Sequence, residues 1–263
     1  MTEQRNACIV IPIYKDLSAW EQQALANNLK ILHSHHATFI YPEGYDIGRL
    51  HGAYPHVELL AVSDEWLGKK HGIDGYNRMM LSEKFYGLFA SYRYILICHT
   101  DAWIFRDEIA EWCARDYDLV AAPWPTRPIY RYLPFWLLKP FAYKNNPRSP
   151  FRRQDLCGHV GNGGLSLRKV ETFRKACIDY RRAIEYYYGE CDVYEDVFWA
   201  MVPKFSYPHE DEALRFAFDN KPAHLFRRNG KRLPMGCHGF QHPRRLKFWQ
   251  KFIDIDFDTL TAQ

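Results

Sequence analysis

The chain has 263 residues, enough to bury a sizeable core, and its 47% apolar and 25% charged residues are typical of a globular protein. A net charge of +4 is too weak to indicate a nucleic-acid partner, and no apolar run reaches the length of a membrane span. Seven cysteines without a CxxC pair favour reduced thiols in a cytosolic protein over disulfides or a zinc site. The N-terminal apolar run is too short for a signal peptide. The 16% aromatic content fits either a carbohydrate-facing surface or a tyrosine-rich core.

The first sixty residues predict three strands and one helix. Apolar runs at 7–14, 37–42 and 57–62 are typical of buried strands. After the first run, Ser18 and Glu21 have the spacing of a helix-capping box, and apolar residues follow at helical intervals.

The next part of the chain continues the alternation. Residues 74–92 predict one helix, and the runs at 94–97 and 118–124 predict two more strands. The apolar face of that helix comprises Leu81, Phe85, Leu88 and Phe89. Strands that alternate with helices predict an α/β fold with a mostly parallel central sheet flanked by helices, and we expect a single domain over 1–263.

A basic, aromatic segment at about 127–156 interrupts this pattern. It combines prolines, aromatic residues and six cationic side chains with no acid from 129 to 153. A second stretch, 242–252, has a similar mixture. Both stretches suit an anionic bilayer surface, and the alternative is an insertion that packs on the core with its charges solvated.

A carboxylate follows the buried run at 94–97. Ligands of parallel α/β sheets bind outside the carboxyl ends of the strands, where Asp101, Pro12 and Tyr14 are expected. The alternative is that Asp101 only caps a helix.

Three later segments contain further candidate residues. In 160–173, three glycines within four residues allow either a close backbone approach or positive φ, and a helix is expected to follow them. Glu195 and Asp196 are adjacent acids at a predicted helix start, where acids are also favoured for electrostatic reasons. His238 lies between two glycines in a predicted loop and is a ligand candidate or a plain loop histidine.

The order of these segments resembles the GT-A glycosyltransferases. In that fold a strand ends in a D-x-D motif, and His99-Thr100-Asp101 takes its place here. The sequence is similar to an uncharacterised bacterial GT-A-like family. The shared motifs are Gly75-Tyr76-Asn77, Asp101-Ala102-Trp103, Ala122-Pro123-Trp124, Gly161 to Arg168 and Gly236-Cys237-His238.

The resemblance implies a glycosyltransferase that moves a sugar from a nucleotide-sugar, with a UDP-sugar favoured, to a saccharide or lipid-linked acceptor in bacterial surface glycan synthesis. An inverting mechanism is favoured, with Asp196 as general base or Glu195 if the roles are swapped. The implied donor-binding residues are Pro12, Tyr14, Tyr76, Asn77, Lys84, His99, Thr100 and Asp101. The implied acceptor or sugar-binding residues are Asn162, Gly163 and Gly164.

A divalent cation, Mn²⁺ or Mg²⁺, would be held by Asp101 and His238, although His99 replaces the first Asp of the motif. Asn77 and Lys84 are two turns apart on one helix face, so Lys84 could reach the donor diphosphate. We expect a cytoplasmic enzyme that attaches peripherally to the inner face of the cytoplasmic membrane.

Two other functions fit the same residues. A sugar nucleotidyltransferase would share the sheet and the metal, but the glycine-rich basic loop that such enzymes place after their first strand does not occur in 11–18. A carbohydrate-binding pseudoenzyme would account for His99 and for the aromatic excess.

Overall fold

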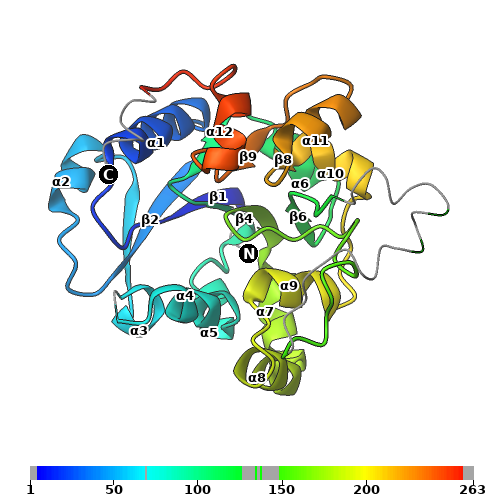
Figure 1. Ribbon diagram of the computed structural model, residues 1–263. Helices are drawn as coiled ribbons and strands as arrows, with labels where there is room; N and C mark the ends of the chain where they lie inside the picture. The colour runs from blue at the N-terminus through cyan, green and yellow to red at the C-terminus, as the bar shows by residue number, and fades with distance from the viewer. Residues whose placement is uncertain (1–4, 69, 126–133, 135–136, 138–147, 257–263) are drawn as a thin grey trace.

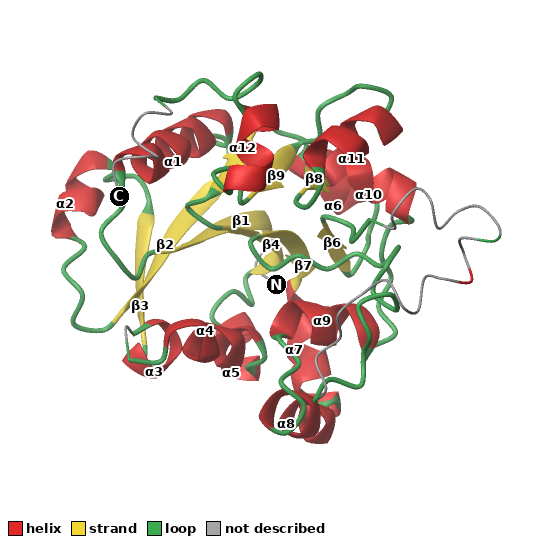
Figure 2. Cartoon of the chain, in the orientation of Figure 1, coloured by secondary structure: helices red, strands yellow, loops and turns green. Residues whose placement is uncertain are grey.

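A computed structural model describes the chain except for residues 1–4, 69, 126–133, 135–136, 138–147 and 257–263. Its centre is a six-stranded sheet in the order β3-β2-β1-β4-β7-β6 (Figures 1 and 2). The strands are β1 (Arg5–Pro12), β2 (His36–Pro42), β3 (Glu58–Val62), β4 (Tyr92–Cys98), β6 (Leu119–Ala121) and β7 (Leu165–Lys169). The first four strands in this order run parallel, while β7 is antiparallel to both of its neighbours. The predicted α/β fold with a mostly parallel central sheet is confirmed.

The sheet is buried on both faces because its strands are apolar on both sides. In β1, Cys8 and Val10 pack into one hydrophobic cluster, while Ala7, Ile9 and Ile11 pack into a second cluster on the opposite face. Helices α4, α5, α7 and α9 lie on one side of the sheet in Figure 1, and α1 and α10 to α12 lie on the other. The helices are α1 (Ala19–Ile31), α2 (Gly48–Ala53), α3 (Asp64–Leu67), α4 (Gly72–Met80), α5 (Glu83–Gly87), α6 (Ile109–Ala114), α7 (Val170–Asp179), α8 (Arg181–Gly189), α9 (Glu195–Met201), α10 (Glu210–Phe216), α11 (Pro222–Arg228) and α12 (Pro243–Trp249).

A second, three-stranded sheet joins the C-terminal part of the chain to the end of β4. It consists of β5 (Ala102–Ile104), β9 (Gly236–His238) and β8 (Ala217–Phe218), in that order. β5 and β9 are antiparallel, with Ala102 opposite His238. This register sets His238 beside the segment that contains Asp101, although the two residues are far apart in the sequence.

The local signals at the N-terminus are confirmed. Ser18 caps α1, and both hydrogen bonds of the capping box with Glu21 are present.

All seven cysteines are free, and six of them are buried. Among the helices that the structure describes, none combines the length and apolar character needed to cross a bilayer.

The two long helices expected from apolar spacing are each divided. The predicted helix 74–92 is divided into α4, which ends at Met80, and α5, which spans Glu83–Gly87, and Tyr92 already belongs to β4. Leu88, expected on the buried face, is 48% exposed. The apolar spacing through 170–184 likewise spans two helices, α7 and α8. The helix expected after the glycine-rich turn is confirmed as α7, which begins at Val170, and the short strand β7 lies between the turn and this helix.

Most of the basic insertion lies outside the described residues. In its described end, Arg148 pairs with Asp192 at 3.3 Å and Arg152 pairs with Asp155 at 3.3 Å, so these two charges have acidic partners. In the second basic stretch, Trp249 is fully buried and stacks on Phe105, so its indole is not available to a bilayer.

Candidate functional site

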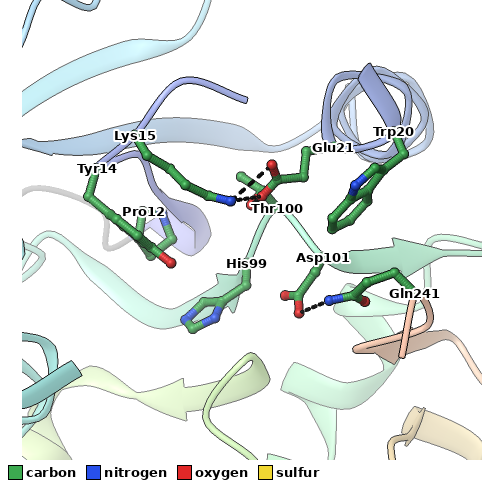
Figure 3. Close-up of a pocket in the computed structure, with 9 residues that line it drawn as sticks. All are labelled: Pro12, Tyr14, Lys15, Trp20, Glu21, His99, Thr100, Asp101 and Gln241. Atoms are coloured by element: carbon green, nitrogen blue, oxygen red, sulfur yellow. Dashed lines mark hydrogen bonds and ion pairs between the residues drawn. The ribbon is translucent and has the colours of Figure 1, made fainter. Parts of the chain in front are cut away.

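The carboxyl ends of β1 and β4 border a pocket of about 250 Å³ (Figure 3). This is the sheet edge where ligands of parallel α/β folds bind. Its lining residues are Pro12, Tyr14, Lys15, Trp20, Glu21, His99, Thr100, Asp101 and Gln241. Five of the residues expected to bind the donor, namely Pro12, Tyr14, His99, Thr100 and Asp101, therefore line one pocket.

Three side chains at this edge form a group that could hold a metal ion. One ligand atom from each of His99, Asp101 and His238 lies within 4.8 Å of the others. His238 Nε2 is 3.1 Å from Asp101 Oδ1, and two adjacent ligands about 2.1 Å from one ion are separated by about 3 Å. His238 Nδ1 is buried and has no hydrogen-bond partner, with Asp219 Oδ1 at 3.8 Å. A carboxylate behind the second ring nitrogen is the usual support of a metal-bound histidine. The donor set therefore fits a divalent cation.

The charges of this group are strongly coupled. Burial alone would lower the pKa of His238, but Asp101 and Asp219 outweigh it and raise the pKa to about 10. Burial would raise the pKa of Asp101, yet His238 holds it well below the usual range of a carboxyl group. Burial, and next the charge of His238, lower the pKa of His99 to about 4, so that ring is neutral at physiological pH. With no cation bound, the positive charge beside Asp101 resides on His238.

Neighbouring residues fix the orientation of these side chains. The Tyr76 hydroxyl lies 2.8 Å from His99 Nε2, and Gln241 Nε2 donates to Asp101 Oδ2 at 3.0 Å. Glu21, although buried, accepts from Thr100 Oγ1 at 2.8 Å and pairs with Lys15 at 3.0 Å. Glu21, which belongs to the capping box of α1, thus also holds Thr100 in place.

The three glycines of the 161–164 turn are needed for close approach and not for positive φ. A methyl group on Gly164 would lie 2.0 Å from His238 Nε2, and one on Gly163 would lie 2.4 Å from Glu195 Oε1. Neither glycine has a positive φ. Asn162 Oδ1 accepts from Gly164 N at 3.0 Å and closes the turn. The turn lies beside the metal-ligand group because β7 runs antiparallel to β4, so the beginning of β7 meets the end of β4.

Glu195 is occupied by a buried ion pair. Its two carboxylate oxygens accept from Arg168 at 2.9 and 3.1 Å, and both side chains are at most 3% exposed. Arg168 also donates to the Tyr86 hydroxyl at 3.0 Å. Both carboxylate oxygens of Glu195 are therefore engaged by Arg168 and are not available for proton transfer. The geometry does not support the alternative in which Glu195 is the general base.

Asp196, the next residue, is only half-buried, whereas Glu195 is buried. Its Oδ1 accepts from the backbone N–H of Val197 at 2.8 Å. Burial, and next the charge of Glu195, raise the pKa of Asp196 to about 7. A carboxyl group with this pKa can both take up and release a proton near neutral pH.

Comparison with known proteins adds a family and a fold. Residues 56–238 match the family described as "Protein of unknown function (DUF5672)". The chain belongs to this family. The match includes all three residues of the metal-ligand group and the 161–164 turn, whereas Pro12, Tyr14, Glu21 and Gln241 lie outside it. No curated protein matches the sequence.

Two solved structures share the fold of this DUF5672 protein. A galactosyltransferase LgtC in complex with donor and acceptor sugar analogs is 12% identical, with 95% of this chain and 98% of that chain covered and a TM-score of 0.55. An active-site mutant of LgtC is 14% identical over the same shares of both chains, also with a TM-score of 0.55. The GT-A resemblance is thus confirmed at the level of the fold.

Three of the eight predicted donor-binding residues of this DUF5672 protein do not line the pocket described above: Tyr76, which contacts His99 instead, Asn77 and Lys84. Asn77 is 2% exposed, accepts from Glu195 N at 2.8 Å and donates to Ile73 O, so it joins α4 to α9. Lys84 is exposed on α5, a different helix from Asn77, so the shared helix face that suggested its role does not exist.

Six residues of the site were missed from the sequence, namely the pocket-lining Lys15, Trp20, Glu21 and Gln241, and also Asp219 and Arg245. Asp219 is 6% exposed and forms an ion pair with Arg245. Arg245 also donates to the backbone carbonyls of His238 and Gly239, both at 3.3 Å. Arg245 lies in the basic stretch 242–252, but its pairing with Asp219 depends on contacts between β8, β9 and α12, which the sequence does not show.

Proposed function

We propose that this protein is a glycosyltransferase that moves a sugar from a nucleotide-sugar to a saccharide acceptor. The observation that carries the proposal is the His99-Asp101-His238 group, which lies at the ligand-binding edge of a sheet whose fold resembles LgtC. A UDP-sugar is the favoured donor. The lining of the pocket, with Tyr14 at its rim and Lys15 beside Glu21, has the mixed aromatic and polar character of a small-molecule site.

In this proposal, His99, Asp101 and His238 hold a divalent cation, which would supply positive charge to the departing diphosphate. Gln241 and Tyr76 keep the ligands in place, and Asp219 supports the His238 ring. Asp196 takes the proton from the attacking acceptor hydroxyl, as an inverting reaction requires. Its pKa of about 7 supports that role. Asn162, Gly163 and Gly164 form the side of the site toward the sugar.

The proposal is tested by calorimetry with UDP, GDP and CMP and their sugars, with and without Mn²⁺. Asp101→Asn should abolish metal-dependent nucleotide binding and leave the fold intact by circular dichroism. Unchanged nucleotide affinity of this variant at saturating Mn²⁺ would reject the metal role. Binding of free glycans without any nucleotide affinity would instead favour a carbohydrate-binding protein.

We also propose that the protein attaches to the inner face of the cytoplasmic membrane, where a lipid-linked acceptor would be found. The support is the cationic and aromatic composition of 129–153, which suits an anionic surface. Co-sedimentation with anionic vesicles should be strong at low salt and weak at high salt. A protein that stays in the supernatant at both ionic strengths contradicts this proposal.

A further inference from the structure

The metal-ligand group contains two imidazoles and one carboxylate. Among the residues that the structure describes, it consists of His99, Asp101 and His238. Asp101 Oδ1 lies 3.1 Å from His238 Nε2, while Oδ2 is held by Gln241 at 3.0 Å (Figure 3). The protein therefore offers a cation two nitrogen ligands and a single carboxylate group.

Two neighbouring carboxylates are engaged elsewhere and do not add to this set of ligands. Asp219 approaches His238 from the other ring nitrogen, with its Oδ1 3.8 Å from Nδ1, and its charge is paired with Arg245. Glu21 lines the same pocket, but its two carboxylate oxygens contact the Lys15 ammonium group at 3.0 and 3.1 Å. Neither carboxylate is therefore placed to complete a site made of oxygen ligands.

The two imidazoles are held in place by their surroundings. His99 Nε2 lies 2.8 Å from the Tyr76 hydroxyl, and the backbone N–H of His99 donates to Gly164 O at 2.9 Å. The rings of His99 and His238 lie edge to face, with their centroids 5.7 Å apart. A methyl group on Gly164 would lie 2.0 Å from His238 Nε2, so the glycine-rich turn closely covers that ring. Because these contacts fix both rings, a cation bound to Asp101 also meets the imidazoles.

The chemistry of these ligands determines which cation suits the site. Mg²⁺ and Ca²⁺ prefer oxygen ligands, whereas imidazole nitrogen suits transition metals, and Mn²⁺ is the weakest binder among these. We infer that this site selects a transition metal that favours nitrogen ligands, of the Co²⁺ or Zn²⁺ type, over Mg²⁺, and that His99 determines this choice. His99 stands where a D-x-D motif would supply a second carboxylate, so it exchanges an oxygen ligand for a nitrogen ligand. The inference rests on the metal site of the proposed function and not on the transfer reaction.

Calorimetry on the full chain, freed of metal by a chelator and titrated with Zn²⁺, Mn²⁺ or Mg²⁺, tests the inference. We expect the affinity to fall in the order Zn²⁺, Mn²⁺, Mg²⁺. Binding that Asp101→Asn does not weaken is assigned to other histidines and cysteines. His99→Asp supplies the missing carboxylate and should lower the ratio of Zn²⁺ to Mg²⁺ affinity by about tenfold or more, as expected for an altered metal environment. A merely structural defect would weaken all three cations equally and leave this ratio unchanged.

His56→Asp is the matched control, because it also exchanges a histidine for an aspartate. His56 is exposed and precedes β3, at the edge of the sheet where the parallel strands begin, whereas the metal-ligand group lies where they end. This variant should keep the native ratio. His99→Asn offers an amide oxygen without a new charge and should also lower the ratio, so it replaces His99→Asp if circular dichroism shows that the latter does not fold.

Three results would overturn the inference. The first is Mg²⁺ binding at Asp101 that is as tight as Zn²⁺ binding. The second is an unchanged ratio in folded His99→Asp and His99→Asn, which would show that His99 does not determine the choice of metal. The third is an equal change of the ratio in the His56→Asp control.

Titration of UDP in the presence of each cation separates this inference from the proposed function. If no cation binds at Asp101, the metal role in the proposed function and the inference both fail. If Zn²⁺ and Mn²⁺ bind selectively but no nucleotide binds in their presence, the proposed function fails and the metal preference stands. If UDP binds equally well with Mg²⁺, Mn²⁺ and Zn²⁺, and the three cations have equal affinities, only the inference fails.

Discussion

The raised pKa of Asp196 predicts an unusual dependence of stability on pH that requires no substrate. An aspartate has an ordinary pKa of 3.8, and in the folded protein burial and Glu195 raise that of Asp196 to about 7. Between pH 3.8 and about pH 7, Asp196 is protonated in the folded state and has released its proton in the unfolded state. The contribution of Asp196 to the free energy of unfolding is therefore most favourable at low pH and falls as the pH rises through this window.

Asp196→Asn removes this titration and changes little else, because an amide oxygen can still accept from the N–H of Val197. Each pKa unit corresponds to about 1.4 kcal/mol, so the variant should gain about that much stability relative to the native protein for each pH unit between about pH 5 and pH 7. The total gain over this range is roughly 2–3 kcal/mol, and the difference should level off above pH 7.

Urea unfolding at pH 5, 6, 7 and 8, in the presence of a chelator, measures the stability difference directly. Asp179→Asn, which alters an exposed carboxylate at the end of α7, is the control for removing a carboxylate, and the change with pH for Asp196→Asn should exceed the change for this variant. A pH-independent difference for Asp196→Asn would show that its carboxyl group is not held protonated in the folded state. The reasoning for its role as a base would then fail with it.

Three other expectations follow from the site. Glu195→Gln should lower the free energy of unfolding by about 3–5 kcal/mol in urea, because it leaves Arg168 buried without its counter-charge. Full stability combined with loss of transfer would identify Glu195 as the base instead. Gly164→Ala should abolish Mn²⁺ binding by calorimetry, because the methyl group would meet His238, whereas Gly52→Ala has open space and should bind normally. The transfer rate of the native enzyme should rise with pH and level off above about pH 7, when Asp196 has lost its proton. A rate that falls across that range would contradict a general base of this pKa.

Much of the fold could be predicted from local sequence patterns. The buried strands β1 and β4 consist of continuous apolar runs, and the box formed by Ser18 and Glu21 marks the start of α1. The break between α4 and α5 also had a local signal, since Ser82 is a residue favoured at helix starts. The apolar spacing around it continued across the break and concealed it.

The site was predicted less completely because its geometry depends on contacts between distant segments. Strand-end reasoning located Asp101, but the sequence gave no sign of the antiparallel pairing of β7 with β4, which brings the glycine-rich turn to the same edge. Arg168 sits in a short strand whose pattern gives no sign that both faces are covered. Its pairing with Glu195 is visible only once β7 and α9 are packed together.

The three-stranded sheet affects how the metal-ligand group responds to heating. His238 belongs to β9, a strand of three residues that is held between β5 and the two-residue β8, and Asp219 directly follows β8. Strands of two or three residues open locally at a lower free energy than the central strands of a large sheet. Such an opening would separate His238 and Asp219 from Asp101 while the six-stranded sheet remains intact. We therefore expect heating to abolish metal binding reversibly before the bulk of the secondary structure unfolds.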